Sequence, residues 1–160
     1  MDIFSLAGWT AWVITVIVML AKPLSILFKG LFIKILPYRQ WLGITLSLFA
    51  ILHVVLFVIR VGDVSFFFDP GYWNFTTFTG WGVLSFVVML PLFVTSNKLS
   101  MKLLKKNWKR IQLLAYVFFI AVGLHIYLAN GQWYFSLLPI GIWLLLYIIA
   151  FIKLRSSKEK

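Results

Sequence analysis

Residues 111–152 of this chain read IQLLAYVFFIAVGLHIYLANGQWYFSLLPIGIWLLLYIIAFI, a run without a single Asp, Glu, Lys or Arg. One helical crossing of a bilayer core needs about 20 apolar residues, so the run is long enough for two crossings. Asn130, Gly131 and Gln132 lie near its middle and are residue types found in turns. We therefore predict two membrane-spanning helices joined by a tight turn at these three residues.

The rest of the chain has the composition of an integral membrane protein. Of its 160 residues, 62% are hydrophobic and 12% are charged, and the mean hydropathy is +0.99. These values lie outside the range of a soluble domain. The chain also has no cysteine, which excludes disulfides, thiolate-held iron–sulfur clusters and covalent haem attachment at a C-x-x-C-H motif.

Further runs without charged residues predict the other spans. They cover residues 3–21, 40–59 and 70–97. We predict an all-α integral membrane protein with one domain over residues 1–160, folded as a five-helix transmembrane bundle. The expected spans are about residues 7–27, 40–60, 78–96, 110–129 and 134–153.

The basic residues predict the orientation of this bundle. Fourteen of the 15 fall at one set of helix ends, and Arg60 alone lies at the other. The fourteen are Lys22, Lys29, Lys34, Arg39, Lys98, Lys102, Lys105, Lys106, Lys109, Arg110, Lys153, Arg155, Lys158 and Lys160. By the positive-inside rule, the N-terminus lies outside and the C-terminus in the cytoplasm. The net charge of +11 is then explained by membrane topology, and we expect no nucleic acid partner.

The only two histidines, His53 and His125, each lie deep inside a predicted span. His53 comes 13 residues after Gln40 and His125 comes 15 after Arg110, so both lie about 20 Å from the cytoplasmic surface. Two imidazoles at one depth on parallel helices can bind the two faces of an iron porphyrin. Zinc fits less well, because two ligands do not complete a tetrahedral site. We predict that His53 and His125 are the axial ligands of a b-type haem.

Three neighbouring residues suit such a cofactor. Arg60 follows His53 by seven residues, which returns it to the same helix face, where it would pair with haem propionates. An arginine that reaches lipid headgroups is the equal alternative. Ala50 and Ala121, each about one turn before a histidine, would leave room for the edge of the macrocycle. Small residues are also common wherever membrane helices touch.

Several stretches resemble the ferric-reductase-like transmembrane domain family. They are GWTAWVITVIVMLAKPL from residue 8, RQWLGITLSLFAILH from residue 39, LFVTSNKLSMKLLKKNWKRIQLLAYV from residue 92 and GLH from residue 123. The resemblance covers about residues 7–153. Within the family, the sequence most resembles the haem-binding membrane subunit of the bacterial periplasmic methionine sulfoxide reductase system. It implies His53 and His125 as axial ligands, a bacterial inner (cytoplasmic) membrane, and electron transfer from a quinol or cytoplasmic flavin to an outside acceptor.

The chain departs from that family in two ways. We expect it to lack an additional first helix, and Gln112 stands where relatives carry a further histidine thirteen residues before the last one. With no imidazole to hold a second, inner haem, we expect one haem. Another carrier must then serve the inner half, and we expect a quinone or a flavin (FMN or FAD) near Gln40, Trp41, Trp108 and Gln112.

The function expected from these observations is electron transfer by a b-type cytochrome. A quinol or flavin would reduce the haem, which would pass electrons to a protein docked outside at residues 61–79, such as a periplasmic reductase. No glycine-rich nicotinamide fingerprint is present, so we expect an electron-transfer subunit of an oxidoreductase system rather than a complete enzyme. The alternatives are a small non-redox transporter or assembly subunit, and a haem-sensing or haem-handling membrane protein.

Overall fold

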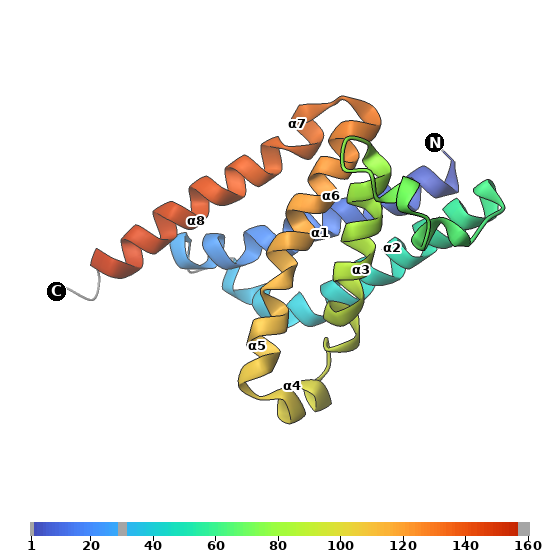
Figure 1. The fold of residues 1–160 in the computed structure, drawn as a ribbon. Helices are drawn as coiled ribbons and strands as arrows, with labels where there is room; N and C mark the ends of the chain where they lie inside the picture. Colours follow the sequence, from blue (N-terminus) through green and yellow to red (C-terminus); the bar gives the residue numbers. More distant parts are fainter. Residues whose placement is uncertain (1, 29–31, 157–160) are drawn as a thin grey trace.

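The computed structural model describes residues 2–28 and 32–156, and every regular element in these ranges is a helix (Figure 1). Lys29, Lys158 and Lys160, used above to predict the orientation, lie outside the described residues. The α-helices are α1 (Ile3–Leu27), α2 (Arg39–Val61), α3 (Phe78–Val94), α4 (Lys98–Leu104), α5 (Lys106–Gln112), α6 (Leu114–Asn130), α7 (Trp133–Ser136) and α8 (Leu138–Ser156). Short 3-10 helices are η1 (Phe32–Lys34), η2 (Leu36–Tyr38), η3 (Ser65–Phe67) and η4 (Pro70–Trp73).

Four helical segments among the described residues are long and apolar enough to cross a membrane. They are Ile3–Leu27, Phe32–Val61, Lys106–Asn130 and Trp133–Ser156. A fifth candidate is α3 taken together with α4, although the chain bends by 89° between them. The class predicted from the sequence is therefore confirmed: the protein is an all-helical, multi-pass membrane protein with four to five candidate spans.

The predicted turn in the long apolar run is present. Helix α6 ends at Asn130, and Gly131 follows in the left-handed conformation with φ of 68°. Its N–H donates to the carbonyl of Tyr127 at 2.7 Å, which satisfies one of the free carbonyls at the helix end. A glycine takes this conformation without steric cost, so the chain can reverse direction here before α7 and α8.

The helices pack as two antiparallel pairs. Helix α1 packs along α2, and α3 packs along α6, while α8 lies against α1. Figure 1 shows the α3–α6 pair crossing the layer formed by α1, α2 and α8. Two buried clusters join the pairs: Trp12, Met19, Phe119 and Ile126 form one, and Leu46, Met89, Leu92 and Phe118 form the other.

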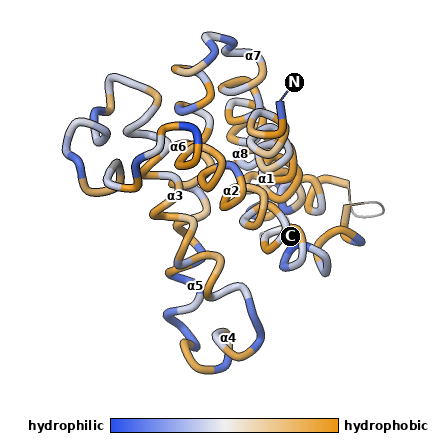
Figure 2. Tube along the Cα trace, turned by 90° about the vertical axis from the view of Figure 1, so that its right-hand side faces the viewer, coloured by the Kyte–Doolittle hydropathy of each residue, from blue (hydrophilic) through white to orange (hydrophobic). Residues whose placement is uncertain are grey.

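The outer surface of the bundle is apolar, as expected for a protein in lipid. Of the 19 residues of α8, Ala150 is the one that is buried, although most of the helix is hydrophobic. A helix that is apolar all round and exposed is stable in a bilayer, where its backbone groups bond internally. Figure 2 shows hydrophilic residues mainly at the helix ends and loops, including the α4–α5 hairpin, and apolar residues along the helices.

Candidate functional site

The two histidines lie close together in the middle of the bundle. His53 comes from α2 and His125 from α6, so each belongs to a different helix pair. Their ring centroids are 6.4 Å apart, and the ring planes are inclined by 81°. The fold thus brings together two side chains that are far apart in the sequence.

Each imidazole is held by a backbone carbonyl on the partner helix of its own pair. The Nδ1–H of His53 donates to the carbonyl oxygen of Phe4 on α1 at 3.0 Å. The Nδ1–H of His125 donates to the carbonyl oxygen of Phe78 on α3 at 2.8 Å. A carbonyl oxygen only accepts hydrogen bonds, so in both rings the hydrogen is on Nδ1 and the lone pair is on Nε2. Nε2 is therefore the nitrogen that remains for a metal.

The distance between the rings fits two ligands on opposite sides of one metal ion. Imidazole nitrogens bind first-row metals at about 2.0 Å, and the ring centre lies roughly 1.2 Å behind the nitrogen. Two such ligands in line place their ring centres about 6.4 Å apart. The observed separation of 6.4 Å matches this value.

The donor set favours haem over an isolated metal ion. Among the described residues, no group of three or more His, Cys, Asp or Glu side chains is placed to hold a metal. Two imidazoles leave a tetrahedral zinc site incomplete. A porphyrin brings four nitrogens of its own, so two axial histidines complete its iron.

A cavity of about 360 Å³ contains both histidines, which lies in the range of about 300–1,000 Å³ found for ligand pockets. Its walls are mostly apolar and include Phe57, Phe67, Phe78, Phe86, Val83, Met89, Phe118, Val122 and Ile126. Four polar residues lie where α1 and α3 begin and α6 ends, namely Ser5, Tyr72, Thr79 and Asn130. Thr15 and Ser85 line the cavity farther along α1 and α3, and their hydroxyls donate to backbone carbonyls of their own helices. The cavity can hold a flat apolar group with polar substituents directed toward the end where the four polar residues lie.

Of the three residues expected beside the cofactor, one lines the cavity that contains the histidines. Ala50 lines the cavity. Ala121 is buried but does not line it; Val122 and Phe118 face the cavity from α6 instead. The helix face that lines the cavity therefore includes Val122, three positions before His125, and not Ala121, four positions before it.

Arg60 lies at the end of α2 and reaches toward the start of α1. Its guanidinium is 3.6 Å from the carboxylate of Asp2 and lies 5.9 Å from the centre of the Phe4 ring. Phe4 in turn stacks on His53 with 4.2 Å between ring centroids. Arg60 is thus linked to the first histidine through Phe4, and its side chain is exposed.

The carboxyl of Asp2 has a pKa below its usual value. The main causes are hydrogen bonds from the side chain and the backbone of Ser5, and Arg60 contributes a smaller electrostatic effect. Asp2 is the N-cap of α1 and accepts the backbone N–H of Ser5 at 2.9 Å. The same cap orders the turn that carries the Phe4 carbonyl.

The residues expected to hold a quinone or flavin gather at the end of α3. The Gln40 amide donates to the carbonyl of Ser96 at 3.1 Å. The Trp108 indole donates to the carbonyl of Thr95 at 3.0 Å, and the Gln112 amide donates to the Thr95 hydroxyl at 3.3 Å. Trp41, by contrast, is 67% exposed. Three of the four side chains thus meet at Thr95 and Ser96, where they stabilise the bend after α3.

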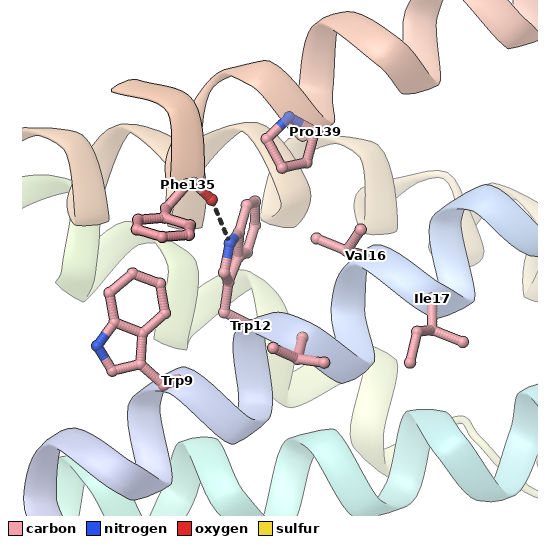
Figure 3. Close-up of a pocket in the computed structure, with 7 residues that line it drawn as sticks. Trp9, Trp12, Val16, Ile17, Phe135 and Pro139 are labelled. Atoms are coloured by element: carbon pink, nitrogen blue, oxygen red, sulfur yellow. Dashed lines mark hydrogen bonds between the residues drawn. The ribbon is translucent and has the colours of Figure 1, made fainter. Parts of the chain in front are cut away.

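A second, apolar groove of about 450 Å³ lies between α1 and the α7–α8 segment. Figure 3 shows Trp9 and Trp12 on α1 facing Phe135 and Pro139, with the Trp12 indole donating to the Phe135 carbonyl at 2.8 Å. Trp9 and Trp12 also line the histidine cavity. These two rings therefore separate the cavity from the groove.

Four further residues contact the histidines and were not predicted from the sequence as site residues: Phe4, Phe78, Gly8 and Gly82. Each phenylalanine supplies the accepting carbonyl, and each glycine follows it by one helical turn. The signal was a repeated Phe-x-x-x-Gly pattern at the start of α1 and of α3. Only its position opposite a histidine makes such a short pattern meaningful.

The chain matches one family model, described as "Ferric reductase like transmembrane component", over residues 4–123. This match covers α1 to α5 and part of α6, includes His53 and ends two residues before His125. No curated protein and no solved structure matches the chain significantly.

Proposed function

We propose that this chain, which belongs to the family of ferric reductase like transmembrane components, is an electron-transfer subunit. In this proposal it holds one haem b between His53 and His125. Membership of the family indicates a role in electron transfer at a membrane. The observation that carries the haem assignment is the pair of imidazoles 6.4 Å apart in one cavity. Both have Nδ1 engaged by a carbonyl and Nε2 available.

The protein residues would hold the cofactor and set its surroundings. Bound here, haem b supplies a one-electron iron couple. His53 and His125 bind the iron, and the carbonyls of Phe4 and Phe78 raise the basicity of these ligands through Nδ1. The apolar walls keep water from the macrocycle. The polar end of the cavity would receive the propionates, and Arg60, which lies beside the Phe4 ring, would supply a cation near them.

The proposed topology has five spans, with the N-terminus outside and the C-terminus in the cytoplasm. It rests on the asymmetry of the basic residues and takes α3 as a span despite the 89° bend that follows it. The haem then lies in the outer half of a bacterial inner membrane. The acceptor, a periplasmic reductase or similar protein, docks at residues 61–79. There Phe68 and Val64 are exposed.

Electrons enter from a quinol or a cytoplasmic flavin. His125 follows Gln112 by 13 positions, which correspond to about 20 Å of helix, so a donor in cytoplasmic water is too far from the iron. The cluster of Gln40, Trp108 and Gln112 at Thr95 supports an inner site for a quinone or flavin. The motifs quoted above resemble those of the haem-binding membrane subunit of a periplasmic methionine sulfoxide reductase system, and this resemblance supports a periplasmic reductase as the acceptor.

The test is the visible spectrum and the haem content of the protein purified in detergent. We expect one haem per chain, with a reducible b-type spectrum that is lost in His53→Ala and in His125→Ala. Gln112→Ala is the control variant, at the end of α5, because it should keep the haem while quinol-driven reduction becomes slower. Full haem content in either histidine variant would contradict the assignment. Haem that no quinol or flavin donor reduces would favour a haem-handling protein.

A further inference from the structure

Each candidate haem ligand lies directly against a glycine on the neighbouring helix. A Cβ atom built on Gly8 would lie 2.9 Å from Nδ1 of His53 and 3.0 Å from its Cε1. A Cβ atom built on Gly82 would lie 2.9 Å from Nδ1 of His125 and 3.0 Å from its Cε1. Non-bonded carbon atoms rest at about 3.5–4.0 Å, so neither position has room for a methyl group while the ring stays in place.

These two glycines serve no evident backbone purpose. Both lie inside regular helices, where glycine costs about 0.5–1 kcal/mol relative to alanine in soluble proteins. Gly62 and Gly131 differ, because they have positive φ angles at helix ends. Gly43 and Gly141 differ again, because a Cβ atom there would meet nothing within 4 Å. Close approach of the imidazole is thus the feature that Gly8 and Gly82 share.

The two contacts are copies of one local arrangement. In each helix pair, the first helix carries Phe-x-x-x-Gly and the second carries the histidine. The ring passes over the glycine and donates its Nδ1–H to the carbonyl one turn earlier, that of Phe4 or Phe78. Both phenylalanine rings also contact the histidine that they bind, Phe4 by stacking and Phe78 edge-on.

We infer that Gly8 and Gly82 are positioning residues that set the place and rotation of the two axial histidines. This inference rests on the proposed function, because it concerns how the ligands meet the iron. A methyl group at either position forces the ring to move by roughly 0.5–1 Å to reach an ordinary contact distance. Metal–ligand bonds tolerate only about 0.2 Å. The displaced ring therefore loses its carbonyl partner or leaves the iron.

The experiment compares Gly8→Ala and Gly82→Ala with Gly43→Ala and Gly141→Ala in the purified haem protein. We expect the first two variants to lose the six-coordinate, low-spin signature from most of the bound haem. Their reduced form should bind carbon monoxide, because one axial position is open. The two controls should keep the wild-type spectrum and reduction potential, since they add the same methyl group in open space.

The possible outcomes separate this inference from the proposed function. A wild-type protein that binds no haem would overturn the proposed function and the inference together. A low-spin wild-type haem that persists unchanged in Gly8→Ala and Gly82→Ala would overturn the inference alone. Loss of the signature in the control variants as well would also overturn it, because the effect would then not depend on the histidine contacts.

A second measurement does not depend on how the variants fold. In the haem-free wild-type protein, ¹⁵N shifts of the two imidazole rings report which nitrogen carries the hydrogen. We expect the Nδ1–H tautomer for both rings, as their bonds to the carbonyls require. The Nε2–H tautomer in either ring would show that the glycine does not bring it within reach of the carbonyl, and would overturn the inference.

Discussion

Replacement of Phe119 by alanine tests how the helix pairs are held together beside the cavity. Phe119 on α6 is completely buried. Its ring stacks on Trp12 of α1 with 5.4 Å between centroids and meets Trp143 of α8 edge-on at 5.8 Å. One ring therefore joins three helices, two of which belong to the α1–α2–α8 layer.

The expected loss of stability is smaller than in a soluble core. There, Phe→Ala costs about 3–5 kcal/mol, partly because the ring is withdrawn from water. In a bilayer the separated helices remain in lipid, which is as apolar as the ring, so mainly the packing contribution is lost. Two aromatic pairs at about 0.5–1.5 kcal/mol each give a loss of about 2 kcal/mol.

The assay is unfolding by SDS in mixed micelles, followed by tryptophan fluorescence. Trp12 lies in the interface that opens and contributes to the emission of the eight tryptophans of the chain, so the signal changes as the helices separate. Val117→Ala is the control on the same helix, because Val117 is 44% exposed and its truncation should cost less than about 0.5 kcal/mol. A loss for Phe119→Ala equal to that of the control would refute the reasoning that this ring holds α6 against α1 and α8.

Three further predictions concern single residues near the candidate site or at a turn. Arg60→Ala should release haem faster in a transfer assay to apomyoglobin, since the propionates lose their cation; an unchanged rate would favour contact with headgroups. Because the pKa of Asp2 is lowered, its contribution to stability is complete above the ordinary value of 3.8 and is lost as pH falls below it; Asp2→Asn should remove that acid dependence from thermal unfolding curves. Gly131→Ala should destabilise the protein by about 1–2 kcal/mol in the SDS assay, because φ is positive there. Gly43→Ala should be nearly neutral in the same assay.

The membrane helices and the two histidines could be predicted because their signals are local. A long apolar run without charge predicts a span wherever it occurs, and Gly131 ends α6 at the predicted turn for reasons that involve only its own backbone. His53 and His125 stand out because they are the only histidines and lie in apolar surroundings. The number of spans was harder to predict, because α3 has 17 residues and a sharp bend follows it.

The contacts of the site could not be predicted with the same ease. Ala121 and Val122 lie four and three residues before His125, both about one helical turn away. The packing of α6 against α3 turns Val122 toward the cavity. Trp108 and Gln112 were expected beside a second carrier, and whether one binds there stays a prediction. Their bonds to Thr95 depend on the bend after α3, which no local pattern indicated.

The sequence by itself determined the membrane class, the approximate helices and the identity of the two candidate ligands. These follow from the hydrophobicity of each segment and from the scarcity of polar side chains in it. Only the tertiary structure decided that the centroids of the two rings lie 6.4 Å apart. It also decided that each ring packs against a glycine and donates a hydrogen bond to a backbone carbonyl. The physical reason is that hydrophobicity places a residue in the bilayer, whereas helix packing sets its rotation and its neighbours.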